Sequence, residues 1–575
     1  MRSTPPLAGG TQGPDALRPL LATVLDALHK GAAHRGGPLP AGGPEAVTAQ
    51  LHHTVGELLP THGTGPEEAL RTLVTALTEG AADPADPLCA AHLHCPPLAV
   101  ATAADLAASA LNPSMDSWDQ APAASALETL VTTLLAHEVY GPGSRPPAAD
   151  VSGSRPAAAD VSGLRATDAD VSGPRPTAAD ASRSRPAAAE ASRSRPTAAD
   201  VSGPRLTHAD ASRSRPTHAD ASGSRPPAAD ASGPRPTAAD APRPRPTAPH
   251  APTTPTPDAL VTTGGTEANQ LAVLLARETA EATAPGEPVH LLVGANAHHS
   301  LARAAWLLGL PEPVTVPAPA GTLDPAALDE ALTALPGPKL VAATAGTTDA
   351  GLIDPLPEIA DICERHGARL HIDAAYGAGA LFSPREAPKL HGLARAHTVA
   401  LDLHKLGWQP VAAGILAVRD TAETRALGHQ ADYLNADDDT EAGLPDLLGR
   451  SLRTTRRPDI LKTAVTFKAL GRTGLAALVD DVTALAHHLA QLIDAHPHFE
   501  LYDTPTLTTV LFRPTGATDE TIATIRRTLL TEGRAVLGRA RMDGKLHLKA
   551  TLLNPHATPE DLTALLELVE GHTPR

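Results

Sequence analysis

Hydrophobic residues recur with different periods along the chain, and the changes of period divide it into regions. Residues 14–140 place apolar side chains three and four positions apart, as in PEEALRTLVTALTEG at 66–80, which is typical of amphipathic helices. One irregular stretch, AAHLHCPPLAV at 90–100, interrupts this spacing. We therefore predict a helical N-terminal segment, with further helices continuing through Trp118 towards its end.

Residues 257–420 alternate instead between short apolar runs and amphipathic segments. Segments such as TEANQLAVLLARETAEA and LPEIADICERHG have helical spacing. The alternation predicts an α/β domain with a mainly parallel sheet. The apolar runs, which we interpret as buried strands, are VHLLVGA (289–295), KLVAATAG (339–346), ARLHID (368–373), HTVALD (397–402) and GILAV (414–418).

The C-terminal region mixes both patterns. Helical segments ILKTAVTFKALG and LAALVDDVTALAHHLAQLIDAH are followed by the strand-like TLTTVLFRP and KLHLKATLL, which predicts a smaller α+β domain. The expected division is a helical segment (1–140), a repeat insertion (141–256), a large α/β domain (257–454) and a small C-terminal domain (455–575).

The insertion consists of decapeptides such as RPTAADASRS, with Arg at every tenth position from 145 to 245. A fixed period first suggests a solenoid, whose units are usually about 20 residues or longer. A ten-residue unit rich in Pro, Ala, Ser and Gly cannot bury enough surface to offset its ordering entropy. We therefore predict a disordered, partly polyproline-like insertion.

Composition and charge narrow the function classes. The 575 residues carry a formal charge of −17, and because the repeats at 145–250 hold 15 Arg against 11 acidic residues, the remainder carries −21. This balance argues against nucleic acid as a partner. Three cysteines are too few for a disulfide framework or a structural zinc site. With no apolar run of about 18 residues and no secretory h-region, we expect a cytoplasmic protein without a membrane span.

Candidate chemistry lies where the predicted strands end, since open parallel sheets bind ligands at that edge. In LVTTGGTEANQLA, Gly264 and Gly265 precede a helix opened by Thr266, which is either a phosphate site or a plain tight turn. In GANAHHSLARAAWLLG, His298 and His299 follow a strand and could cap a helix or stack on a flat ring.

Two further strand ends carry charges. Asp373 ends an apolar strand, and a buried carboxylate there needs a cation, a helix to cap or an ion pair. Lys405, beside His404, is either an amine nucleophile or a solvated surface charge. A phosphate cradle, a ring-stacking His, a buried Asp and a reactive Lys together are what pyridoxal phosphate requires. A metal site is disfavoured because His298 and its neighbouring histidine are adjacent in sequence.

These residues and their surrounding segments resemble the group II pyridoxal-phosphate-dependent amino-acid decarboxylases, over about 90–140 and 257–570. The chain is most similar to the diaminobutyrate and siderophore-type lysine decarboxylase branch. The resemblance implies the aspartate-aminotransferase-like fold, known as fold type I. The segments that carry it are AHLHCPPLAV, SALNPSMDSWDQAPAA, TTGGTEANQLAVLLAR, ATAGTTDAGLIDPLPEIADICERHG, HIDAAYGAGAL, the HK-containing loop with WQPVAAG, ADYLN, SLRTTRRPDILK and LKATLLNP.

The resemblance implies a role for each matching residue. Lys405 is expected to be the Schiff-base lysine, Asp373 the partner of the pyridine nitrogen, and Ala375 the residue under the ring. His298 rather than His299 matches the ring-stacking histidine, since the family motif places it two residues before a Ser. The resemblance also implies a homodimer.

Further contacts follow from the same motifs. Cys95 and Pro96 occupy the position of the family's substrate loop, near the substrate carboxylate. The residues expected to contact the phosphate or the ring hydroxyl are Gly265, Thr266, Thr347 and His404.

The sequence departs from the family in two places. Many relatives carry a proton-donating Tyr in a mobile loop after the lysine strand, but the corresponding NADDDTEAGLPDLLGRS contains none. The nearest is Tyr433, for which we expect a structural role, so that His298 or a water is left as the proton donor. The insertion is the second departure, because relatives have only a short connection there.

The expected activity is decarboxylation of an L-amino acid to the amine and CO₂, with a diamino acid such as 2,4-diaminobutyrate or lysine as substrate. A pyridoxal-phosphate-dependent aminotransferase, or another fold-type-I lyase, is the alternative that fold alone cannot separate. A degenerate scaffold bearing the repeats is the non-enzyme alternative, and the intact Lys405, Asp373 and His298 argue against it.

Overall fold

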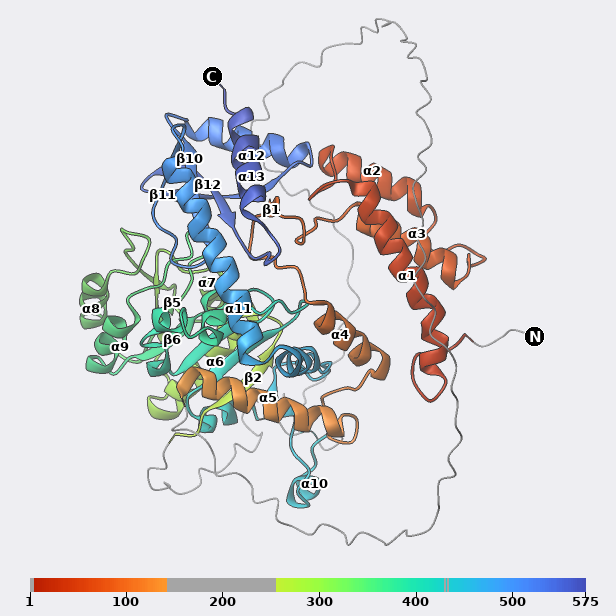
Figure 1. The fold of residues 1–575 in the computed structure, drawn as a ribbon. Helices are drawn as coiled ribbons and strands as arrows, with labels where there is room; N and C mark the ends of the chain where they lie inside the picture. Colours follow the sequence, from red (N-terminus) through yellow and green to blue (C-terminus); the bar gives the residue numbers. More distant parts are fainter. Residues whose placement is uncertain (1–4, 142–254, 429–430, 432–433, 575) are drawn as a thin grey trace, which may run out of the picture. The chain divides into compact units, whose positions relative to one another are not determined.

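A seven-stranded mixed sheet forms the core of the α/β region (Figure 1). The computed structural model describes residues 5–141, 255–428, 431 and 434–574. Strand β8 runs antiparallel to both its neighbours, while the other six strands share one direction. In sheet order the strands are β2 (Asp258–Thr262), β8 (Gly414–Val418), β7 (Thr398–Asp402), β6 (Arg369–Asp373), β5 (Lys339–Thr344), β3 (His290–Gly294) and β4 (Val314–Val316).

The α/β architecture predicted from the sequence is therefore confirmed, with two differences in detail. The run GILAV forms the antiparallel strand β8, and the three-residue β4 was not predicted because VTV is too short to stand out as an apolar run. All five apolar runs interpreted as strands do form strands of this sheet.

Helices cover both faces of this sheet. In β7, Val399 and Leu401 join a core with side chains of α5, α8 and α9, whereas Ala400 between them packs with α6. Because both faces are buried, the strands are continuously apolar. One face is covered by α5 (Pro122–Tyr140), α8 (Pro325–Ala334) and α9 (Leu356–Arg365), and the other by α6 (Gly265–Thr283) and α7 (Ser300–Leu307).

A second sheet of five strands belongs to the same compact unit. Helices α11, α12 and α13 pack against it, and Leu489, Leu529 and Leu566 share one core with Phe512. Its first strand comes from the N-terminal segment and pairs in parallel with β11. The strands in order are β1 (Cys89–Ala90), β11 (Val536–Met542), β12 (Lys545–Thr551), β10 (Thr509–Pro514) and β9 (Phe499–Leu501), and the last two helices are α12 (Asp519–Thr531) and α13 (Pro559–Gly571).

The 36-residue helix α11 (Ile460–Ala495) contacts both sheets. Its two halves are the two helical segments predicted from the sequence, and Gly471 between them has a non-helical backbone (φ 61°, ψ −174°). Leu475 belongs to the core of the seven-stranded sheet and Leu489 to that of the five-stranded sheet. One helix therefore spans two hydrophobic cores.

Four helices precede α5 in the chain. Trp118, expected within a helix, lies in a turn, because α4 ends at Asn112 in a left-handed conformation (φ 45°) and Pro122 begins α5. The helices are α1 (Gly13–Arg35), α2 (Gly43–Val55), α3 (Pro66–Glu79) and α4 (Ala99–Leu111). The short α10 (Asp437–Glu441) follows later, with 3₁₀ helices at Gly377–Phe382, Ala387–Leu390, Leu393–Arg395, Thr421–Leu427 and Leu448–Arg450.

Two ion pairs connect α5 to the region of α11: one to Arg456, just before the helix, and one to Arg472, within it. Glu128 accepts hydrogen bonds from both terminal nitrogens of Arg456, at 2.5 and 2.8 Å, and these side chains are 5% and 1% exposed. Glu138 pairs with Arg472 in the same way at the surface, where the arginine side chain is 67% exposed. The same pairing thus occurs once with a buried arginine and once with an arginine in solvent.

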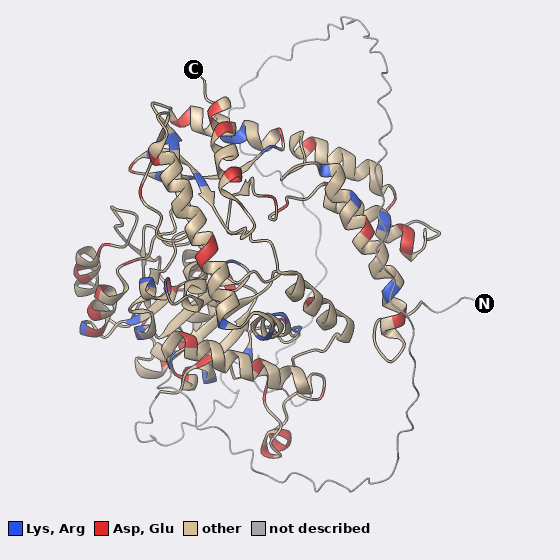
Figure 2. Ribbon diagram, in the orientation of Figure 1, with Lys and Arg blue, Asp and Glu red and all other residues tan. Residues whose placement is uncertain are grey.

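Both signs of charge are spread over the elements that the structure describes (Figure 2). Helix α9 mixes acidic side chains with Arg365, whereas α10 is acidic along its length. Of the described helices, none combines the length and the apolar composition that crossing a bilayer requires. The insertion predicted to be disordered (141–256) lies almost entirely outside the described residues, so that prediction stays untested.

Candidate functional site

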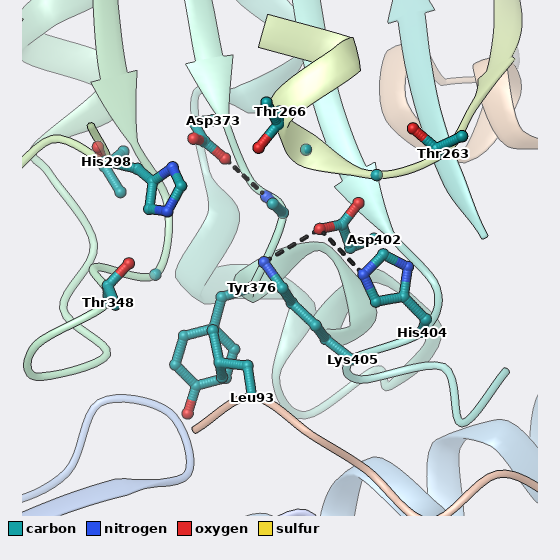
Figure 3. Close-up of a pocket in the computed structure, with 15 residues that line it drawn as sticks. Leu93, Thr263, Thr266, His298, Thr348, Asp373, Tyr376, Asp402, His404 and Lys405 are labelled. Atoms are coloured by element: carbon teal, nitrogen blue, oxygen red, sulfur yellow. Dashed lines mark hydrogen bonds and ion pairs between the residues drawn. The ribbon is translucent and has the colours of Figure 1, made fainter. Parts of the chain in front are cut away.

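A cavity of about 480 Å³ lies at the carboxyl edge of the seven-stranded sheet (Figure 3). The strand register creates this meeting point: Thr344 pairs with Asp373, while Asp402 and Thr262 both pair with Gly414. The lining residues are Leu93, Thr263, Gly264, Gly265, Thr266, His298, Thr344, Gly346, Thr348, Asp373, Ala375, Tyr376, Asp402, His404 and Lys405.

The loop after β7 supplies a lysine held by a carboxylate. Lys405 Nζ lies 3.0 Å from Asp402 Oδ2, and the carboxylate side chain is only 3% exposed. His404 Nε2 is 3.5 Å from the same oxygen, and its Nδ1 accepts the Ala413 N–H. Burial lowers the pKa of His404, which favours the neutral ring. Figure 3 shows the Lys405 amine directed into the cavity.

The end of β6 supplies a second buried carboxylate. Asp373 Oδ1 accepts the Ala375 N–H at 3.1 Å, and Oδ2 accepts a hydrogen bond from Asn269 of α6 at 2.8 Å. These two donors fix the carboxylate at the cavity wall. The methyl group of Ala375 lies beside it and lines the cavity.

The turn between β2 and α6 opens the cavity towards a helix N-terminus. Gly414 on β8 must be glycine because an added Cβ would lie 2.4 Å from the Gly264 Cα. A Cβ on Gly265 would approach Ala375 Cβ to 2.9 Å. Glu267 accepts hydrogen bonds from the backbone and hydroxyl of Thr263, both at 2.7 Å. The first turn of α6, whose N–H groups have no acceptor within a helix, thus lines the cavity with Gly265 and Thr266 at the positive end of the helix.

The structure separates the two adjacent histidines. His298 lines the cavity and points into it, whereas His299 is exposed at the start of α7 (Figure 3). Burial lowers the pKa of His298, which favours its neutral form. His298 Nδ1 lies 2.8 Å from the hydroxyl of Ser300.

One predicted contact does not line the cavity. The Thr347 hydroxyl accepts the Leu352 N–H at 3.0 Å, so it closes a turn, and its neighbours Gly346 and Thr348 line the cavity instead. Of the predicted residues, those that meet at the cavity are Gly265, Thr266, His298, Asp373, Ala375, His404 and Lys405.

The segment expected to be the substrate loop closes the cavity with a different residue. Leu93 lines it, whereas Cys95 is buried and donates its thiol hydrogen to the His404 carbonyl at 3.2 Å. Burial raises the pKa of Cys95 to about 12, so the thiol stays protonated. This hydrogen bond therefore connects the predicted substrate loop to the loop that carries Lys405. Tyr433 lies outside the described residues.

Sequence reasoning missed several residues of the site. Asp402 ends an apolar strand just as Asp373 does, and that signal would have identified it. Asn269 lies within a helical run and gave no signal, because its role depends on which face of α6 meets β6. Tyr376 follows the predicted HIDAA motif and lines the cavity with its ring.

Comparison with known proteins identifies the class of the site. Residues 247–515 match the pyridoxal-dependent decarboxylase conserved domain. L-2,4-diaminobutyrate decarboxylase of Rhizobium meliloti (strain 1021) is 36% identical over 326 residues, which are 55% of this chain and 65% of that protein. The protein of the same name from Acinetobacter baumannii is 30% identical over 346 residues, covering 55% and 68%.

A solved structure has the same fold as this chain. The glutamate decarboxylase domain of diaminobutyrate-pyruvate transaminase and L-2,4-diaminobutyrate decarboxylase from Vibrio parahaemolyticus has a TM-score of 0.71 and 25% identity, covering 98% of this chain and 97% of that one. The fold and the site are thus those of a pyridoxal-phosphate enzyme. The chain belongs to the pyridoxal-dependent decarboxylase family, as the sequence resemblance predicted, and its cofactor is pyridoxal 5′-phosphate. The aligned part spans about two thirds of the length of the two curated relatives.

The cavity fits this cofactor on grounds of its own chemistry. It offers an amine, a buried carboxylate and a helix N-terminus, which match an aldehyde, a pyridine nitrogen and a phosphate. Asp402 Oδ1 and Thr344 Oγ1 are buried and have no hydrogen-bond partner among the described residues. A polar ligand in the cavity would supply such partners.

Proposed function

We propose that this chain catalyses the pyridoxal-phosphate-dependent decarboxylation of an L-amino acid, giving the amine and CO₂. The observation that carries the proposal is the meeting of Lys405, Asp373 and His298 at one cavity in a chain of the decarboxylase family. A diamino acid, L-2,4-diaminobutyrate first, is the proposed substrate, because both curated relatives and the solved structure carry that name.

We propose the following roles towards the cofactor. Lys405 would hold it covalently, and Asp373 would pair with its ring nitrogen. Ala375 would lie against one face of the ring and His298 against the other. The phosphate would be held by Gly265, Thr266 and His404. The bound cofactor withdraws electrons from the substrate α-carbon, so that the bond to the carboxylate can break.

The protein's own contribution is to fix charge and limit water. The Asp373 carboxylate is held by two hydrogen bonds, so it needs no reorganisation to stay charged opposite the ring nitrogen. Leu93 and the ring of Tyr376 close the cavity on the side opposite α6 (Figure 3). The Tyr376 hydroxyl is engaged with Thr508 and Thr509 at 2.8 and 2.9 Å, so it is not available as a proton donor.

Purified protein loaded with pyridoxal phosphate tests this proposal against a panel of common amino acids, with amine and CO₂ measured together. Equal amounts of amine and CO₂ from a diamino acid are expected. A carbonyl product without CO₂ would instead identify an aminotransferase. Lys405→Ala should lose the visible absorbance of the bound cofactor and lower turnover by several orders of magnitude, since among the described lining residues it is the sole amine. Unchanged absorbance and turnover in that variant would remove the lysine from the mechanism.

Other expectations from the sequence stay proposals. We propose that the chain works as a cytoplasmic homodimer, which light scattering and cell fractionation would test. We also propose the domain division 1–140, 141–256, 257–454 and 455–575, which limited proteolysis would test.

A further inference from the structure

A continuous network of buried polar side chains runs behind the cavity wall. It joins two lining residues, His298 and Asp373, through side chains that the cofactor roles above do not use. Its inner members are Ser300, Asn269, His371 and Thr398, with exposed fractions of 0, 0, 0 and 2%. Each contact along it measures 2.8 or 2.9 Å.

The direction of each hydrogen bond is set at Asn269. Its Nδ2 lies 2.8 Å from Asp373 Oδ2, and a carboxylate accepts only, so the amide nitrogen must face it. Asn269 Oδ1 consequently faces His371 Nε2 at 2.9 Å and accepts a hydrogen bond from it. Burial lowers the pKa of His371 to about 4, so the ring is neutral with its proton on Nε2. Thr398 then donates its hydroxyl to the free Nδ1.

The same amide sets the direction towards His298. Asn269 Nδ2 also donates to the Ser300 hydroxyl oxygen at 2.8 Å, which leaves the hydroxyl hydrogen for His298 Nδ1. The backbone N–H of Ser300 points to the same Nδ1 at 3.3 Å. Two donors converge on this nitrogen, so it carries a lone pair and the ring proton is on Nε2.

We propose that Ser300 and Asn269 are positioning residues that hold His298 as a neutral ring with its Nε2–H directed into the cavity. His298 therefore donates a hydrogen bond to an oxygen of the bound amino acid or cofactor, and it does not serve as a base. This inference rests on the proposed function for the identity of the ligand, but not for the tautomer itself.

The network also couples Asp373 to His298. Asp373 and His371 together hold the orientation of Asn269, because one accepts a hydrogen bond from its amide nitrogen and the other donates to its oxygen. With an amide at position 373, the Asn269 amide can turn over if the His371 proton moves to Nδ1, and its oxygen would then accept the Ser300 hydroxyl. That hydroxyl would no longer donate to His298. Whether residue 373 can accept the hydrogen bond from Asn269 thus determines the tautomer of His298.

Nuclear magnetic resonance on the cofactor-loaded protein, labelled with ¹⁵N in its histidine rings, tests the tautomer directly. Subtracting the spectrum of His298→Gln assigns the signals of His298. We expect a single Nε2–H tautomer in the wild type and a mixture in both Ser300→Ala and Asp373→Asn. Ser125→Ala is the matched control, because it removes another buried serine hydroxyl, one that donates to the Ala121 and Pro122 carbonyls at the start of α5.

Kinetics supply the second measurement. Ser300→Ala should lower kcat/KM for amine formation about three- to tenfold, the effect of one lost hydrogen bond, and Ser300→Thr should restore it. If neither Ser300 variant folds, the tautomer of His298 in Asp373→Asn alone tests the inference, because this substitution preserves the shape of the side chain.

A wild-type His298 that carries its proton on Nδ1, or a tautomer unchanged in Ser300→Ala and in Asp373→Asn, would overturn the inference. Absence of amine production by a wild type with the expected tautomer would instead refute the proposed function and leave the network intact.

Discussion

Replacing Glu128 with glutamine is expected to destabilise the protein by about 3–5 kcal/mol, the cost of removing one partner of a buried ion pair. The Arg456 side chain is 1% exposed, and Glu128 supplies the acceptors for both of its terminal nitrogens. Its Nε has no partner among the described residues. Glutamine keeps the shape and one acceptor oxygen but leaves the buried cation without a counter-charge.

The assay is urea unfolding of the cofactor-loaded protein, read as the shift in transition midpoint. The double variant Glu128→Leu/Arg456→Met should lie within about 1 kcal/mol of the wild type or above it, since buried pairs are often replaced by apolar residues at no net cost. Glu138→Gln is the matched control: it leaves behind Arg472, whose side chain is 67% exposed and therefore solvated, and should cost less than about 1 kcal/mol.

Equal losses from Glu128→Gln and Glu138→Gln would refute the reasoning, because burial would then make no difference. So would a double variant as unstable as the sum of its single changes, since the penalty would then not arise from the unpaired charge.

Three further predictions concern the cavity, the buried network and the insertion. Gly265→Ala should weaken pyridoxal phosphate binding about five- to 150-fold in a fluorescence titration, because its Cβ would lie 2.9 Å from Ala375 and overpacking costs about 1–3 kcal/mol. Gly571→Ala, whose Cβ would meet nothing within 4 Å, is the control. Stability should fall as pH drops from about 6.5 towards 4, by up to about 1.4 kcal/mol per pH unit from His371, because burial lowers its pKa to about 4 and only the unfolded chain takes up the proton there. The urea midpoint of His371→Gln should depend less on pH, and equal slopes would contradict this. Replacing residues 145–250 with a short Gly/Ser linker should leave folding and amine formation largely intact, since long loops cost little stability; a folded product without activity would assign the insertion a role at the cavity.

The predictable part of the site is the part that lies at strand ends. Asp373, Lys405 and His298 each follow an apolar run, so that their meeting at one sheet edge follows from the α/β pattern alone. Their family motifs then suggested the cofactor. Strand direction was not visible in the same way, because GILAV has the composition of a parallel strand and is antiparallel only through its pairing with β2 and β7.

The residues that escaped prediction are those whose role depends on packing between elements. Asn269 is one polar position in an otherwise ordinary amphipathic helix, and only the way α6 lies on the sheet brings it to Asp373. Thr347 differs in another way, since its motif suggested a ligand contact, whereas its hydroxyl accepts the Leu352 N–H in a local turn and its two neighbours line the cavity. Sequence pattern thus identified the strands and the residues at their ends, while the residues that support them are set by how the helices pack on the sheet.

Helix α11 restricts how the length of this chain can change. An α-helix advances about 1.5 Å and turns about 100° per residue, so one residue inserted or deleted between Leu475 and Leu489 would rotate everything beyond it. Leu489 would then leave the second core while Leu475 stayed in the first. Relatives should therefore vary in length in their loops, but keep fixed the number of residues between the positions of Leu475 and Leu489.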